Sequence, residues 1–160
     1  MDGSTAPPGP SIKARALRYL AAREHSRAEL AAKLARFVTD EDEPGALERV
    51  LDELAAKGFI NEARVAESVL HRRAGRLGGA RVLQELRAKG LPDQVLEDAA
   101  QQLRDTELER ARAVWHKKFG VPPQDAAERA RQLRFLAARG FGGAVANRVI
   151  KGLADEDEPI

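Results

Sequence analysis

The sequence has 160 residues, of which 32% are charged and 4% are aromatic, and it contains no cysteine. The lack of cysteine excludes disulfides and thiol catalysis and favours a reducing, cytoplasmic location. The low aromatic content argues against one thick core, whereas small helical modules in a row need only a thin apolar stripe on each helix. The net charge is only +2, so the distribution of charge along the chain has to indicate the partners.

The two ends of the chain differ from its middle. Residues 1–10 are rich in glycine, proline, serine and threonine and hold no apolar run. They match neither a signal peptide nor a membrane anchor, and we expect a disordered tail. Residues 155–160 are mostly acidic, and we expect a second loose tail there.

One short motif occurs three times in the chain. A leucine is followed by two residues, a cation, a glycine and an apolar residue at positions 54–59, 86–91 and 136–141. Glycine enters the left-handed conformation without a Cβ clash, and a cation is favourable in the last turn of a helix. The motif therefore predicts helix ends at Gly58, Gly90 and Gly140.

A first repeat of three helices is expected in residues 11–60. Ser11 can cap the first helix, which ends at His25, and residues 26–29 form a capping box that starts the second. Pro44 opens the third helix. The expected inward positions are Ala14, Leu17, Leu20 and Ala21, then Leu30, Leu34 and Val38, then Leu47, Val50, Leu51 and Leu54.

The four carboxylates at 40–43 come directly before Pro44. Carboxylates suit the positive end of a helix dipole. They lack the alternating oxygen-ligand pattern of a calcium loop, and we interpret them as a helix start rather than a metal site.

A second repeat is expected in residues 61–104. Asn61 caps its first helix, which breaks at Gly75 or Gly78, and Pro92 opens its last. Between them lies a short amphipathic helix with Leu86 in the core. The inward positions are Val65, Ala66, Val69 and Leu70, then Val82, Leu83 and Leu86, then Val95, Leu96, Ala99 and Leu103.

A third repeat is expected in residues 105–154. A second capping box at 106–109 predicts a new helix that runs to Phe119, and Gly120 with the following prolines forces a turn. Two further helices carry Ala126, Ala130, Leu133 and Leu136 or Ala137, and then Val145, Ala146, Val149, Ile150 and Leu153. The prediction is an all-α fold of three tandem three-helix repeats, which resemble helix-turn-helix units, in an elongated, curved arrangement with nine helices and no sheet.

No group of residues indicates catalysis. His25, His71 and His116 fall in different repeats without a metal-ligand spacing, and no phosphate-binding loop or nucleophile elbow occurs. We interpret the glycine pair at 78–79 as a turn between helices. Trp115 and Phe119 are one helical turn apart and could stack on bases, but we favour a core role for them. The prediction is a non-enzymatic protein without a metal or cofactor.

Basic charge is the remaining signal. Residues 61–90 hold seven cations and three anions, and residues 105–154 hold ten and five. Paired side chains on a solvated helix face, contact with phosphates and contact with an acidic protein all explain this excess. The candidate binding residues are Arg72, Arg73, Arg76, Arg81, Arg87, Lys89, Lys117, Lys118, Arg131, Arg134 and Arg139.

The order of motifs resembles the RecX family, the regulatory proteins of the RecA recombinase. The resemblance covers residues 14–153. It rests on Arg-Glu-His-Ser-Arg-Ala-Glu-Leu at 23–30, Leu-Ala-Ala-Lys-Gly-Phe-Ile at 54–60 with Ala-Arg-Val-Ala at 63–66, Gly78 with Gln-Glu-Leu-Arg-Ala-Lys-Gly at 84–90, Lys-Lys-Phe-Gly at 117–120, and Arg-Phe-Leu-Ala-Ala-Arg-Gly-Phe at 134–141.

The resemblance implies a cytoplasmic, monomeric protein without membrane contact that acts in recombination, DNA repair and the SOS response. Its implied partners are the RecA filament and single-stranded DNA, with duplex DNA weaker. It would lie in the filament groove and inhibit ATP hydrolysis, filament extension and strand exchange. Two alternatives stay open: a helix-turn-helix-like regulator that binds DNA directly, which would need a recognition helix, and a helical scaffold for an acidic protein.

Overall fold

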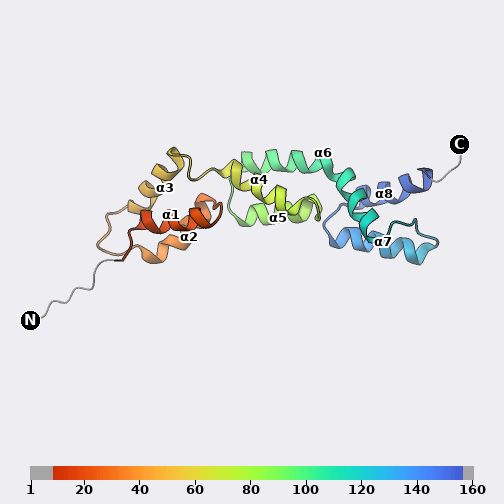
Figure 1. Ribbon diagram of the computed structural model, residues 1–160, viewed down its shortest axis with the longest axis horizontal. Helices are drawn as coiled ribbons and strands as arrows, with labels where there is room; N and C mark the ends of the chain where they lie inside the picture. The colour runs from red at the N-terminus through yellow and green to blue at the C-terminus, as the bar shows by residue number, and fades with distance from the viewer. Residues whose placement is uncertain (1–8, 157–160) are drawn as a thin grey trace, which may run out of the picture. The chain divides into compact units, whose positions relative to one another are not determined.

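The structure, a computed structural model, describes the backbone of residues 9–156 and the side chains of residues 9–152. The described part is all-helical and holds no strand, which confirms the predicted fold class (Figure 1). The elements are α1 (Ile12–Ala22), α2 (Arg27–Leu34), the 3-10 helix η1 (Ala35–Phe37), α3 (Ala46–Ala56), α4 (Glu62–Arg73), α5 (Gly79–Ala88), α6 (Asp93–Lys118), α7 (Ala126–Ala138) and α8 (Gly143–Glu156). The chain divides after Val65 into two compact units, here called the N-terminal and C-terminal units.

Helices α1 to α3 pack around the core of the N-terminal unit. Its buried apolar residues are Ala16, Leu30, Leu34, Leu51, Leu54 and Ile60. Ser11 caps α1 by accepting from the Ala14 amide, and Ser26 and Glu29 form the expected capping box of α2. Gly58 has a φ of 81°, which confirms the helix stop after α3.

Several boundaries in the N-terminal unit differ from the prediction. α1 ends at Ala22 rather than His25, and the predicted inward residues Ala14 and Ala21 are exposed. α2 tightens into η1 after Leu34, so Val38 is 41% exposed instead of continuing the apolar face.

Pro44 is not the first residue of the third helix. The Asp42 carboxylate accepts from the Thr39 amide at 2.8 Å and closes a turn. α3 then begins at Ala46, after Gly45 in the left-handed conformation. The helix therefore starts two residues later than the proline indicated.

The C-terminal unit contains most of α4 and all of α5 to α8. α5 packs on α6, and α6 packs on both α7 and α8. Val82 and Leu86 of α5 are fully buried, as predicted for its apolar face. Gly90 and Gly140 have φ values of 67° and 92°, so all three leucine-cation-glycine motifs end a helix.

The predicted break between the sixth and seventh helices is wrong, because α6 runs unbroken through 26 residues. The Thr106 hydroxyl donates to the Gln102 carbonyl at 3.1 Å inside the helix and does not act as an N-cap. Residues 101–105 contain neither glycine nor proline, so nothing local interrupts the helix. The described chain accordingly has eight α-helices instead of nine.

Trp115 lies in the core of the C-terminal unit, which confirms the core interpretation over the stacking platform. It is 1% exposed, and its indole N–H donates to Gln132 Oε1 at 2.8 Å. Gln132 in turn donates to the Val121 carbonyl at 3.0 Å. α8 extends to Glu156, so the expected acidic tail begins within a helix, while residues 1–8 and 157–160 lie outside the described residues.

Candidate nucleic-acid interface

Six of the ten cations of the N-terminal unit pair with carboxylates. Lys13 and Lys57 donate to the same Glu53 oxygen at 2.7 and 2.8 Å, and these hydrogen bonds lower the pKa of Glu53 to about 2. Arg27 pairs with Asp52 at 2.6 Å. Further pairs join Arg23 to Glu29, Arg49 to Glu43 and Arg64 to Glu24. Arg15, Arg18, Lys33 and Arg36 form no ion pair with a described residue; Lys33 contacts His25 at 2.9 Å, and Arg15 and Arg36 lie over the ring of Phe37.

Four of the eleven candidate cations come together in the C-terminal unit. They line a hollow of about 480 Å³ between the end of α4, the C-terminal half of α6 and α7. We call it the basic pocket, and its lining is Gly75, Arg76, Ala113, Val114, Lys117, Lys118, Phe135 and Arg139. Among the described residues, the lining contains no carboxylate.

Local sequence explains why these side chains meet. His116, Lys117 and Lys118 form the last turn of α6, where cations are favoured by the negative end of the helix dipole. Arg139 is the C-cap of α7, directly before Gly140. Two of the chain's helix ends therefore deliver cations to one place, and Arg76 joins them from the turn after α4.

The cations of the pocket are held loosely. The side chains of Arg76 and Lys117 are exposed and form no ion pair with any described residue. Lys118 Nζ and the Arg139 guanidinium carbon lie 5.5 and 5.1 Å from the centre of the Phe135 ring. Such cation–π contacts leave the charged groups able to bind an anion.

The other candidate cations lie outside the pocket, and several are engaged within the fold. Arg73 pairs with Glu85 at 3.3 Å, and Arg131 pairs with Glu128 at 3.3 Å. Arg81 donates to the Ala138 carbonyl at 2.7 Å. Arg72 donates to the Ser68 carbonyl, at 3.4 Å, in its own helix. Arg87 and Arg134 are exposed on α5 and α7, and Lys89 is the half-buried C-cap of α5.

The turn between α4 and α5 is fixed against the turn between α7 and α8. The Gly78 amide donates to the Arg139 carbonyl at 2.7 Å. A Cβ atom on Gly78 would overlap the backbone of Gly140 and Phe141, so only glycine permits this approach. Because Arg139 lines the basic pocket, this contact also fixes one wall of the pocket.

Arg110 in the middle of α6 secures the same turn from the other side. Its Nη1 donates to the carbonyls of Ala74 and Leu77 at 2.9 and 2.6 Å, and its Nη2 donates to the Leu103 carbonyl at 3.0 Å. Burial lowers the pKa of the Arg110 guanidinium, and the Glu107 carboxylate opposes that shift. Arg110 is therefore a structural cation, which binds backbone rather than a partner.

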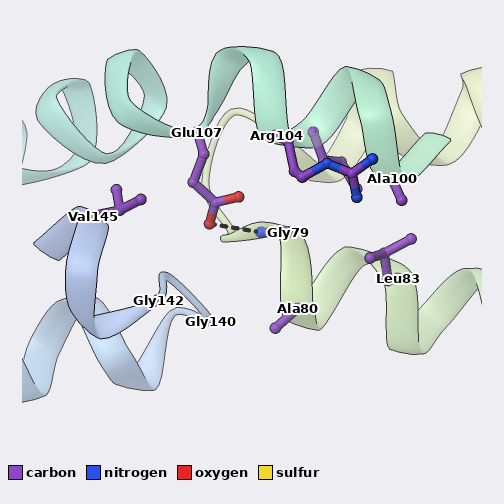
Figure 2. Close-up of a pocket in the computed structure, with 10 residues that line it drawn as sticks. Gly79, Ala80, Leu83, Ala100, Arg104, Glu107, Gly140, Gly142 and Val145 are labelled. Atoms are coloured by element: carbon purple, nitrogen blue, oxygen red, sulfur yellow. Dashed lines mark hydrogen bonds between the residues drawn. The ribbon is translucent and has the colours of Figure 1, made fainter. Parts of the chain in front are cut away.

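Glu107 completes this junction and borders a second hollow. Its Oε1 accepts from the Gly79 amide at 3.2 Å, as the dashed line in Figure 2 shows. The hollow has a volume of about 400 Å³, and Leu83 and Val145 contribute to its largely apolar lining. Arg104 and Glu107 are its only charged lining residues. It therefore lacks the cation cluster that distinguishes the basic pocket.

Sequence reasoning missed Phe135 and the junction residues Glu107 and Arg110. Phe135 comes directly before the leucine of the third leucine-cation-glycine motif, and nothing in that position distinguishes it from an ordinary apolar helix residue. The glycine pair at 78–79 indicated a special turn, but nothing in the nearby sequence indicated that this turn contacts the turn between α7 and α8. Among the described residues, no histidine and carboxylate cluster could hold a metal ion. No described helix has the length and apolarity to cross a membrane.

Three family models match consecutive parts of the chain. They describe the first, second and third three-helix domains of RecX and match residues 13–54, 61–99 and 105–150. A regulatory protein RecX from Leptothrix cholodnii is 56% identical over 92% of this chain and 91% of its own. Another regulatory protein RecX, from Ralstonia nicotianae, is 51% identical over 94% of this chain and 95% of its own.

Solved structures show the same fold. The crystal structure of RecX from Lactobacillus salivarius matches with a TM-score of 0.74 at 19% identity and covers 89% of this chain and 94% of that one. A second crystal structure of a regulatory protein RecX matches with a TM-score of 0.69 at 20% identity and covers 88% of this chain and 71% of that one. With the three domains in order and close relatives over nearly its whole length, the chain belongs to the RecX family, which consists of regulatory proteins and not of enzymes.

Proposed function

We propose that this protein regulates the RecA recombinase in the cytoplasm by binding the RecA filament on single-stranded DNA, and that the basic pocket is its main contact. Bound in this way, it inhibits ATP hydrolysis, filament extension and strand exchange, and so acts in recombination, DNA repair and the SOS response. Membership of a regulatory family supports the role, and the RecX resemblance supplies the partner.

The basic pocket is the observation that carries the proposal. Four cations line one concave surface without an opposing carboxylate. A surface of this kind attracts phosphates, and each neutralised phosphate releases counterions, which makes binding strongly dependent on salt. A nucleoprotein filament presents such phosphates in a regular array.

The test measures RecA's ATP hydrolysis and strand exchange on single-stranded DNA over a series of protein ratios. We expect suppression of both at or below one protein per RecA. An unchanged rate at every ratio would remove RecA as the target.

Filter binding over a salt series separates the alternatives. We expect the tightest binding to RecA-coated single strands, weaker binding to bare single strands, and the weakest to bare duplex. A preference for duplex would favour the helix-turn-helix-like DNA regulator. Binding to neither form of DNA, coated or bare, would leave the scaffold for an acidic protein.

A further inference from the structure

We infer that the basic pocket binds one nucleotide of a single strand, with a phosphate among Arg76, Lys117 and Arg139 and the base against the ring of Phe135. This inference rests on the proposed function and deepens it, because it names the part of the filament that the pocket recognises. It assigns the pocket to the nucleic acid rather than to the protein of the filament.

The cations favour a phosphate. Arg76 and Lys117 are exposed and unpaired within the described residues, and Arg139 faces the same hollow. No carboxylate lines the pocket, so a bound anion would meet no like charge there. A phosphate offers oxygens to several cations at once, and arginine binds it in a bidentate manner.

The aromatic ring favours a base beside that phosphate. Phe135 is partly exposed, and the partly buried Phe119 meets it at 83° with the ring centres 5.3 Å apart, which supports the ring from one side. Proteins that bind single strands combine a basic groove with aromatic rings on which bases stack. Arg139, whose guanidinium carbon lies 5.1 Å from the centre of the Phe135 ring, brings one of the proposed phosphate-binding cations next to the ring.

The size and walls of the pocket agree with a nucleotide better than with a carboxylate side chain. Its volume of about 480 Å³ lies within the range of about 300–1,000 Å³ typical of small-molecule sites. Ala113 and Val114 add apolar wall next to Phe135. A planar base would cover this apolar surface, whereas the carboxylate of an acidic peptide would leave it in contact with water.

The shape of the site also selects single strands. A base in a duplex is paired and stacked, and it reaches a pocket only after it is extruded at a cost. A base in a single strand pays little of that cost. Duplex DNA is therefore expected to contact only the rim of the pocket, through its phosphates.

The test uses the full chain without RecA and two labelled probes followed by fluorescence anisotropy. One probe is a short oligothymidylate, and the other is an abasic strand of the same length and charge. The pocket variant is Arg76→Gln with Lys117→Gln. The matched control, Arg104→Gln with Arg148→Gln, removes the same charge from exposed positions of the same unit outside the pocket.

We expect the pocket variant to bind the oligothymidylate at least about tenfold more weakly and its salt slope to fall by about 0.7, since the pocket neutralises one phosphate and single strands lose about 0.7 per phosphate contact. The control should lose clearly less. Phe135→Leu should weaken oligothymidylate binding at least about fivefold and leave abasic binding unchanged. Phe135→Tyr, which keeps the ring, should restore it.

The following results would each contradict one part of the inference or of the proposed function. Equal losses in the pocket and control variants would show that the pocket is not a phosphate site. If Phe135→Leu weakens binding of both probes equally, or if Phe135→Tyr does not restore binding of the oligothymidylate, base contact is refuted. If the pocket variant binds bare strands normally but fails on RecA-coated strands, the pocket binds protein: the inference falls and the proposed function stands. If RecA is unaffected but pocket-dependent strand binding persists, the inference stands and the proposed function falls.

Discussion

Replacement of Gly78 by alanine tests whether the junction around the basic pocket is rigid. The new methyl group would overlap the Gly140 carbonyl and the Phe141 amide, which are backbone atoms and cannot rotate away as a side chain could. Overpacking of this kind costs about 1–3 kcal/mol. Loss of the buried bond from the Gly78 amide to the Arg139 carbonyl adds about 0.5–1.5 kcal/mol. We therefore expect Gly78→Ala to lower the free energy of unfolding by about 1.5–4.5 kcal/mol.

The assay is urea denaturation followed by circular dichroism, with Gly75→Ala as the matched control. Gly75 lies in the same turn, and a Cβ atom there would meet nothing within 4 Å. The control should stay within about 0.5 kcal/mol of the parent. If the two variants unfold at the same urea concentration, the close approach of the two turns is wrong, and with it the fixed position of Arg139.

Two further predictions concern the cores. Leu86→Ala should lower the free energy of unfolding by about 2–5 kcal/mol, because Leu86 is fully buried. The shift of the urea midpoint at unchanged m-value measures this loss. An unchanged midpoint would contradict the helix register. Burial lowers the pKa of His25 below 6.5, and the charges of Arg23 and Lys33 lower it further. The hydrogen bond between His25 and the Arg23 carbonyl opposes this shift. The unfolded chain then binds the proton at higher pH than the folded chain, so stability should fall as pH drops below about 6.5 and level off below the folded pKa. His25→Gln should remove this part of the pH dependence, and an identical pH profile in the variant would contradict the assignment.

Glycine stops and side-chain caps were predicted better from local sequence signals than the helix ends at His25 and Pro44. The three glycines that follow a leucine and a cation all end helices with positive φ, and the caps at Ser11, Ser26 and Asn61 form as expected. Each of these features depends on groups within a few residues of one another. The capping box at Thr106 has the same local pattern but fails, because a cap forms only where the chain leaves the helix and no breaker makes it do so there.

The candidate site was only partly predictable, for a related reason. Counting charges identified the basic stretches but could not separate Arg76 and Lys117, which form no ion pair with a described residue, from Arg73 and Arg81, which bind within the fold. That distinction depends on contacts between positions far apart in the sequence. The donor Arg81 and its acceptor at Ala138 are 57 residues apart.

The unbroken α6 is the feature that makes the basic pocket a preformed site. Arg110 binds the carbonyls after α4, and Lys117 and Lys118 lie two turns further along the same helix. A flexible break between Arg110 and Lys117 would have let the cations of α6 move relative to Arg76, and binding would then have to order them. Because one helix carries both the anchor and the cations, less conformational entropy is lost when a ligand binds. The helix that joins the second and third repeats thus serves the candidate site as well as the fold.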